Sequence, residues 1–156
     1  MNIATRLTEV LTQHRARLRA LVGQPVESSR VVWYAPWDGM HAASPVVLRV
    51  GGRNLELWSI AAAEFGFTWD ELDLKRAPFY WVGHQDPQSS WAEDAVGPLW
   101  RARGQVIRGV RLISADNRCG GVEFAFDGWA LTLFTESDTM QITDQALAFK
   151  PQWVAV

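Results

Sequence analysis

The side chains with potential for chemistry are few in this 156-residue chain, and the histidines come first. His41 follows Trp37 and Asp38 in one predicted loop, and His84 precedes Asp86 in another. A histidine near a carboxylate can act as a general base or bind a metal ion. A metal site needs at least three converging ligands, and no local spacing supplies them. We therefore expect neither a metal ion nor another cofactor.

Nucleophile motifs are also missing from the sequence. No serine lies in a Gly-x-Ser-x-Gly elbow. The single cysteine, Cys119, follows Arg118, and a neighbouring positive charge lowers the pKa of a thiol. Residues 116–121, however, have the composition of a turn-rich loop between two strands. The sequence therefore predicts no catalytic residue and favours a protein that is not an enzyme.

Acidic residues and tryptophans gather between residues 61 and 103. Residues 38–100 carry four basic and nine acidic groups, a net charge of −5, whereas residues 1–37 carry +3 and residues 101–156 are balanced. Aromatic anchors with charged neighbours are typical of protein interfaces, and an acidic surface attracts a basic partner. The predicted partner-binding residues are Trp69, Asp70, Glu71, Asp73, Trp91, Glu93 and Asp94. The same residues could instead have structural roles, because carboxylates also stabilise helix N-termini and tryptophans also fill cores.

A different class of function uses another set of residues. Tryptophans can stack on sugar rings and share a pocket with the histidines, which would make the protein a small-ligand or glycan-binding protein, or a hydrolase. The residues of this alternative ligand site are Trp37, His41, Trp81 and His84. A concave pocket lined by these residues would favour the ligand, and a flat or convex surface would favour the protein partner.

Composition argues against two classes of partner and suggests a compartment. The acidic middle of the chain and the net charge of −2 argue against nucleic acid, whose phosphates require cationic groups. The longest apolar run, residues 31–35, is far shorter than the roughly 20 residues of a membrane helix. A lone cysteine and an N-terminus without a signal-peptide core suit the reducing cytoplasm. The excess of arginine over lysine suits a GC-rich bacterial genome.

The elements that must position these residues begin with a helix, predicted over residues 1–22. Apolar residues recur there at steps of three and four, which is typical of an amphipathic helix packed on a core. Gly23 and Pro25 follow this stretch and favour its termination. His14 lies on the apolar stripe, so we predict that it is a half-buried packing residue.

Two segments of the chain resemble each other, which indicates an internal duplication. Residues 23–26 match residues 104–107, and residues 46–58 match residues 122–134. In both copies, alternating apolar residues surround a Gly-Gly or Asp-Gly pair, the pattern of a β-hairpin. The predicted repeats, residues 23–60 and 104–145, each contain one strand and one hairpin. Trp58 and Phe134 break the alternation at matching positions, so we expect the second face to be covered there, with the N-terminal helix as the candidate cover.

Residues 61–103, between the two copies, are predicted to form an acidic, Trp-rich linker. Thr68 to Glu71 and Ser90 to Glu93 both have the spacing of a helix capping box, so we expect each to begin a short helix. Residues 146–156 are predicted to form a C-terminal tail.

These features predict a single α+β domain, with an N-terminal helix packed on antiparallel sheet built from a duplicated three-stranded unit. The hairpin pattern of residues 122–128 and 131–133, followed by Asp138 and Ile142, resembles small bacterial β-hairpin proteins, several of which are similar to immunity proteins of polymorphic or type VI-secreted toxins. The likeness covers the two hairpin blocks and carries over no functional residue. It implies a non-enzymatic protein that occludes the active site of a basic toxin domain. Exposed sheet edges would also allow a homodimer.

Overall fold

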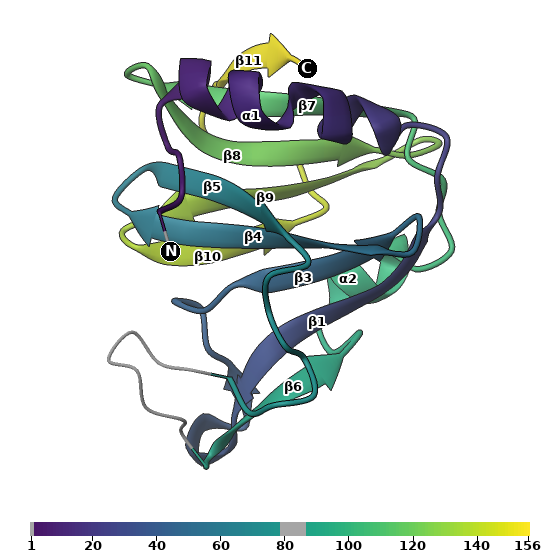
Figure 1. Ribbon diagram of the computed structural model, residues 1–156, viewed down its shortest axis with the longest axis vertical. Coiled ribbons are helices and arrows are strands. Elements are labelled where there is room, and N and C mark those ends of the chain that lie inside the picture. The colour runs from purple at the N-terminus through teal and green to yellow at the C-terminus, as the bar shows by residue number, and fades with distance from the viewer. Residues whose placement is uncertain (1, 79–86) are drawn as a thin grey trace.

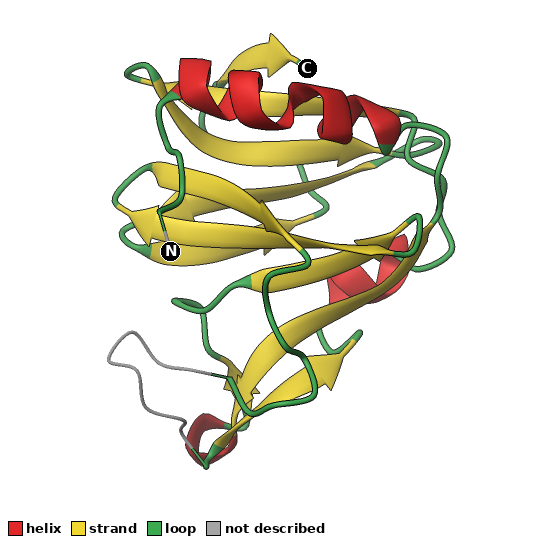
Figure 2. Ribbon diagram, viewed as in Figure 1, coloured by secondary structure: helices red, strands yellow, loops and turns green. Residues whose placement is uncertain are grey.

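A computed structural model describes residues 2–78 and 87–156, in which two antiparallel sheets pack together with two α-helices (Figures 1 and 2). The α+β class predicted from the sequence is confirmed. The first half contains α1 (Leu7–Ala20), β1 (Val26–Tyr34), the 3₁₀-helix η1 (Ala35–Trp37), β2 (Gly39–Met40), β3 (Val46–Val50), β4 (Arg53–Ala61), β5 (Glu64–Trp69) and β6 (Ser89–Glu93). The second half contains α2 (Gly97–Ala102), β7 (Gly109–Ala115), β8 (Arg118–Ala125), β9 (Ala130–Glu136), β10 (Thr139–Thr143) and β11 (Gln152–Ala155).

The two sheets share one topology. In the first sheet β1, β3, β4 and β5 form an antiparallel meander, and β6 pairs with the other side of β1, which also carries the short β2. In the second sheet β7, β8, β9 and β10 form the meander, and β11 pairs with the other side of β7. Each sheet is therefore longer than the predicted three-stranded unit. The predicted linker contains β5 and β6 as well as α2, and the predicted C-terminal tail contains β11.

The two halves meet where each chain segment leaves its helix. Four backbone hydrogen bonds of 2.7–2.9 Å join these segments: Gly23 N–H to Ile107 O, Gly104 N–H to Val26 O, Val26 N–H to Gln105 O, and Ile107 N–H to Gln24 O. The two segments correspond at an offset of 81 residues, so that Gly23 matches Gly104 and Val26 matches Ile107. Each bond donated by one segment has a counterpart donated by the other, as a local two-fold axis produces. This reciprocity is what a duplicated chain would show, but the common origin of the two halves stays a prediction.

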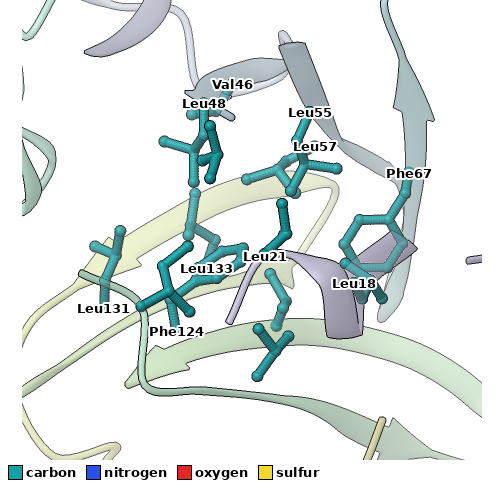
Figure 3. Close-up of a cluster of buried hydrophobic side chains, with 14 of the residues drawn as sticks. Leu18, Leu21, Val46, Leu48, Leu55, Leu57, Phe67, Phe124, Leu131 and Leu133 are labelled. Carbon is teal, nitrogen blue, oxygen red and sulfur yellow. The ribbon is translucent and has the colours of Figure 1, made fainter. Parts of the chain in front are cut away.

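The core lies between the sheets and the helices. The inner faces of the two sheets face each other, and α1 contacts β7 and β8 of the second sheet as well as β5 of the first (Figure 1). The helix α2 contacts β1 of the first sheet and β9 of the second, so each helix packs against both sheets. Figure 3 shows the resulting cluster, to which α1 contributes Leu18, the first sheet Leu57 and Phe67, and the second sheet Phe124 and Leu133. All five side chains are buried.

The N-terminal helix is shorter than predicted, because residues before Leu7 have other partners. Leu7 N–H donates to Asn117 O, and Thr5 O accepts Cys119 N–H, so this stretch runs along the start of β8. Further back, Ile3 lies against Gly66, where a Cβ would be 2.3 Å from Ile3 Cγ2. The predicted end is confirmed, since α1 stops at Ala20 and Gly23 has a left-handed φ of 88°.

The two capping-box predictions are wrong. Residues 68–69 belong to β5 and residues 90–93 to β6, and the only described helix of this region, α2, begins at Gly97. In β5 the alternation of Phe65, Phe67 and Trp69 supplies a buried inner face, and burial outweighs a local capping preference. The turn expected over residues 116–121 is confined to 116–117, and β8 begins at Arg118.

Candidate functional site

The outer face of the first sheet contains a cleft of about 510 Å³, which we call the first cleft. Its floor is formed by Val32 of β1, Trp58 of β4 and Trp91 of β6. Val32 and Trp91 are directly opposite each other in the β1–β6 pair, so their side chains share one face of the sheet. Residues from 71–78 form a wall, and residues 43–45 line another part. The lining is mainly apolar, with charged side chains only in the wall.

The wall is held above the sheet by the buried carboxylate of Glu56. Its Oε1 accepts the backbone N–H groups of Glu71 at 2.6 Å and Leu72 at 2.8 Å, and its Oε2 accepts the hydroxyl of Thr68. The Thr68 hydroxyl oxygen also accepts the indole N–H of Trp58 at 2.7 Å. A buried carboxylate is costly unless its lone pairs are satisfied. Glu56 therefore positions both the wall and the Trp58 ring.

The rim of the cleft contains both paired and free charges. Asp73 forms an ion pair with Arg76 at 3.3 Å, and the Arg76 carbonyl accepts the indole N–H of Trp91 at 3.1 Å, which fixes that ring. Glu93 lies two residues after Trp91 and so shares its face of β6. Within the described part of the chain, the carboxylates of Glu71 and Glu93 form no hydrogen bond or ion pair, and both residues are exposed. The rim thus offers one free negative charge, at Glu71, and the charge of Glu93 lies beside it on β6, directly opposite Arg30.

The structure brings three of the seven predicted partner-binding residues to the first cleft, namely Glu71, Asp73 and Trp91, and Glu93 follows Trp91 on β6 without lining the cleft. The other three have structural partners elsewhere. Trp69 faces the core, is 9% exposed, and donates its indole N–H to His14 Nδ1 at 3.2 Å.

Asp70 and Asp94 both have positive φ angles, and their carboxylates stabilise the turns in which they lie. The Asp70 carboxylate accepts the backbone N–H of Asn54, which is the main reason that its pKa lies below the usual range, and it also pairs with Arg53. The Asp94 carboxylate is 4% exposed and accepts both the backbone N–H and the hydroxyl of Ser29, as well as a hydrogen bond from Arg103.

Two of the four residues predicted for the alternative ligand site, Trp37 and His41, contact each other. The rings of Trp37 and His41 stack with centroids 5.6 Å apart and planes 10° apart, and Trp37 is 65% exposed. His41 Nδ1 lies 2.9 Å from the hydroxyl of Ser44, which lines the first cleft. The pair therefore borders the cleft. Trp81 and His84 lie outside the described residues, as does the rest of residues 79–86.

Sequence reasoning missed the residues that build the cleft. In the sequence, Trp58 stands out only because it breaks the alternation of apolar and polar residues. This break is the signal that could have pointed to the cleft. The second face is only partly covered at Trp58 and Phe134, and α1 is not the cover. Trp58 lines the first cleft together with Ile3 and residues from 71–78, and Phe149 packs edge-on against Phe134 at 5.5 Å. Glu56 gave no signal, because a charged residue within a strand is normally assigned to solvent.

Two groups with potential for chemistry, Cys119 and His14, do not line the first cleft. Cys119 is fully buried, and burial raises the pKa of its thiol to about 12. Burial, and then the positive charge of Arg17, lower the pKa of His14, whose Nδ1 accepts a hydrogen bond from Trp69. Within residues 2–78 and 87–156, no three side chains of His, Cys, Asp or Glu are placed to hold a metal ion.

Comparison of the chain with protein-family models, with curated proteins and with solved structures gives no match. None of the helices in the described part of the chain combines the length and the apolar character that crossing a bilayer requires. What the protein does must therefore be inferred from the geometry of the first cleft.

Proposed function

We propose that this protein is a non-enzymatic binding module, and that the first cleft takes in an apolar or aromatic group that carries a positive charge beside it. The observation that carries this proposal is the combination of two tryptophans in the floor with the free carboxylate of Glu71 at the rim and that of Glu93 beside it on β6. The volume of about 510 Å³ lies within the range of roughly 300–1,000 Å³ that is typical of ligand pockets. Burying an aromatic group there would remove apolar surface on both sides from water.

A side chain of a partner protein is the first source of such a group. Interface hot spots form where an apolar anchor enters a pocket and charged residues surround it. Glu71 and Glu93 would face basic residues around the anchor and speed the encounter electrostatically. A basic toxin domain fits this description, so the proposal includes an immunity-type protein of the bacterial cytoplasm that neutralises its toxin by covering the active site.

The test compares capture of the partner by matched variants. The tagged protein, its Glu71→Gln/Glu93→Gln variant and a Glu9→Gln/Glu136→Gln control are used as baits in a lysate of the source organism. Both double variants remove two exposed negative charges, but only the first removes them from the rim and from β6 beside it. We expect one stoichiometric basic protein to be retained by the control and lost with the rim variant. Equal retention by both variants would refute the assignment of the rim as the interface.

A small molecule is the second source, and the concave shape of the cleft favours it. Native mass spectrometry of the protein purified from the same lysate distinguishes the two sources. A co-purifying compound of a few hundred daltons, lost in a Trp91→Ala variant, would identify a ligand-binding protein. A bound polypeptide would identify the protein partner. If the purified protein carries neither and captures nothing, the binding proposal fails.

A further inference from the structure

The second sheet has a cleft of about 490 Å³ at the place that corresponds to the first cleft. Trp153 of β11 is directly opposite Ile113 of β7, as Trp91 of β6 is opposite Val32 of β1. The segment that follows β10, residues 144–151, forms a wall of this second cleft, just as the segment that follows β5 forms a wall of the first. The two clefts therefore share the position of one tryptophan and of one wall, whereas the rest of their floors differs, because neither Ile113 nor Phe134 lines the second cleft.

Charged groups dominate the floor of the second cleft. Arg111 binds the carboxylate of Glu123 through two hydrogen bonds, Nε to Oε1 at 2.7 Å and Nη2 to Oε2 at 3.1 Å. The same guanidinium lies over the Trp153 ring, 3.7 Å from its centroid. The Arg111 group is thus held rigidly on two sides, and its Nη1 makes no hydrogen bond with the described residues.

The lining of the cleft contains two cationic and two anionic side chains, and only one of the four is unpaired within the described part of the chain. Both of its carboxylates are paired, Glu123 with Arg111 and Asp144 with Arg101 at 3.2 Å. Hydrogen bonds from Gln145 and Arg101 lower the pKa of Asp144, so it stays ionised in that pair. Lys150, which lines the cleft, has no ion pair or hydrogen bond with any residue that the structure describes. The unpaired Lys150 and the Arg111 guanidinium therefore both line the second cleft.

We infer that the second cleft binds a small organic anion, an apolar or aromatic body that bears one carboxylate. The Lys150 ammonium and the Arg111 Nη1 amino group would receive the carboxylate, since cationic donors form the strongest hydrogen bonds to anions. Trp153 and the half-exposed Phe149 supply apolar surface for the body. The cation expected in the first cleft would be repelled here, so the two clefts select ligands of opposite charge.

Ligand titration followed by NMR tests this inference with 3-phenylpropionate as the probe. The indole N–H signal of Trp153, assigned with a Trp153→Phe variant, should shift saturably, with the millimolar affinity expected of a fragment with eleven non-hydrogen atoms. Lys150→Gln should weaken binding by about threefold to fivefold, because exposed charge pairs are worth that much. Lys75→Gln removes the same charge outside the cleft and should leave the affinity unchanged. The cation 3-phenylpropylamine should bind this cleft more weakly than the anion.

Three results would overturn the inference. The first is the absence of a saturable shift at Trp153. The second is equal weakening by Lys150→Gln and Lys75→Gln, which would mean that only the overall charge matters. The third is equal binding of 3-phenylpropionate and 3-phenylpropylamine, which would reduce the cleft to an unselective apolar surface. None of these results bears on the first cleft, so the two proposals fail separately.

Discussion

Gly121 offers a sharp test of how the second sheet is packed. It lies in β8 directly opposite Phe134 of β9. A Cβ at this position would lie 2.6 Å from the carbonyl oxygen of Leu133 and 2.7 Å from Phe134 Cβ. Ordinary contacts between such atoms are about 3.5 Å or longer. Because the obstructing atoms lie on or next to the neighbouring backbone, Gly121→Ala must push β8 and β9 apart.

The magnitude follows from two opposing effects. Overpacking costs about 1–3 kcal/mol, and rigid backbone neighbours place this site near the upper end. Replacing glycine with alanine also restricts the unfolded chain, which returns about 0.5–1 kcal/mol. We therefore expect Gly121→Ala to lower the free energy of unfolding by about 2 kcal/mol. Gly120 is the matched control, since a Cβ there meets its nearest atoms at 3.6 Å, and Gly120→Ala should raise that free energy by about 0.5 kcal/mol.

Urea unfolding of the two variants and the parent protein, followed by circular dichroism, measures both effects. With a slope of about 2 kcal/mol/M, the midpoints of the two variants should differ by about 1 M. If Gly121→Ala proves as stable as Gly120→Ala, then β8 and β9 do not approach as closely at this point as the structure has them, and the reasoning is refuted.

Two buried groups allow further predictions. Because the pKa of His14 is lowered in the folded protein, the unfolded chain binds a proton that the folded chain does not, and the free energy of unfolding should fall as the pH drops below about 6.5. Urea unfolding at pH 7.5 and 5.5 checks this, and an unchanged pH dependence in His14→Gln would contradict it. The Cys119 thiol should not react with a disulfide reagent at pH 8 in the folded protein and should react once urea unfolds it, because burial raises its pKa to about 12 and blocks access. Rapid reaction of the folded protein would contradict this.

The hairpins were predictable because their signals are local. Gly51, Gly52 and Gly128 adopt the positive φ angles that the Gly-Gly and Asp-Gly pairs indicated, and the strands on either side follow the apolar alternation. The end of α1 was predictable for the same reason. In each case a short stretch of sequence contains both the turn residue and the apolar pattern that decide the structure.

The remaining features depend on partners distant in the sequence. β6 and β11 are strands only because they pair with β1 and β7, and nothing within Ser90 to Glu93 distinguishes that strand from the start of a helix. The first cleft depends on Glu56 meeting the backbone of residues 71–72, a contact that no periodicity reveals. Some of the predicted acidic residues therefore lie at the first cleft and others stabilise turns, and only the fold distinguishes these two roles.

The packing of each helix against both sheets has a consequence for how the chain acquires its structure. Residues 1–95 contain the whole first sheet but lack α2, and α1 then has its contact with β5 but lacks β7 and β8. The emerging chain on a ribosome would therefore keep apolar strands exposed until β7 and β8 have been synthesised. Such long-range pairing slows folding and leaves time for aggregation. The same interlocking makes the two halves one cooperative unit, in which loss of either sheet removes the cover of the other.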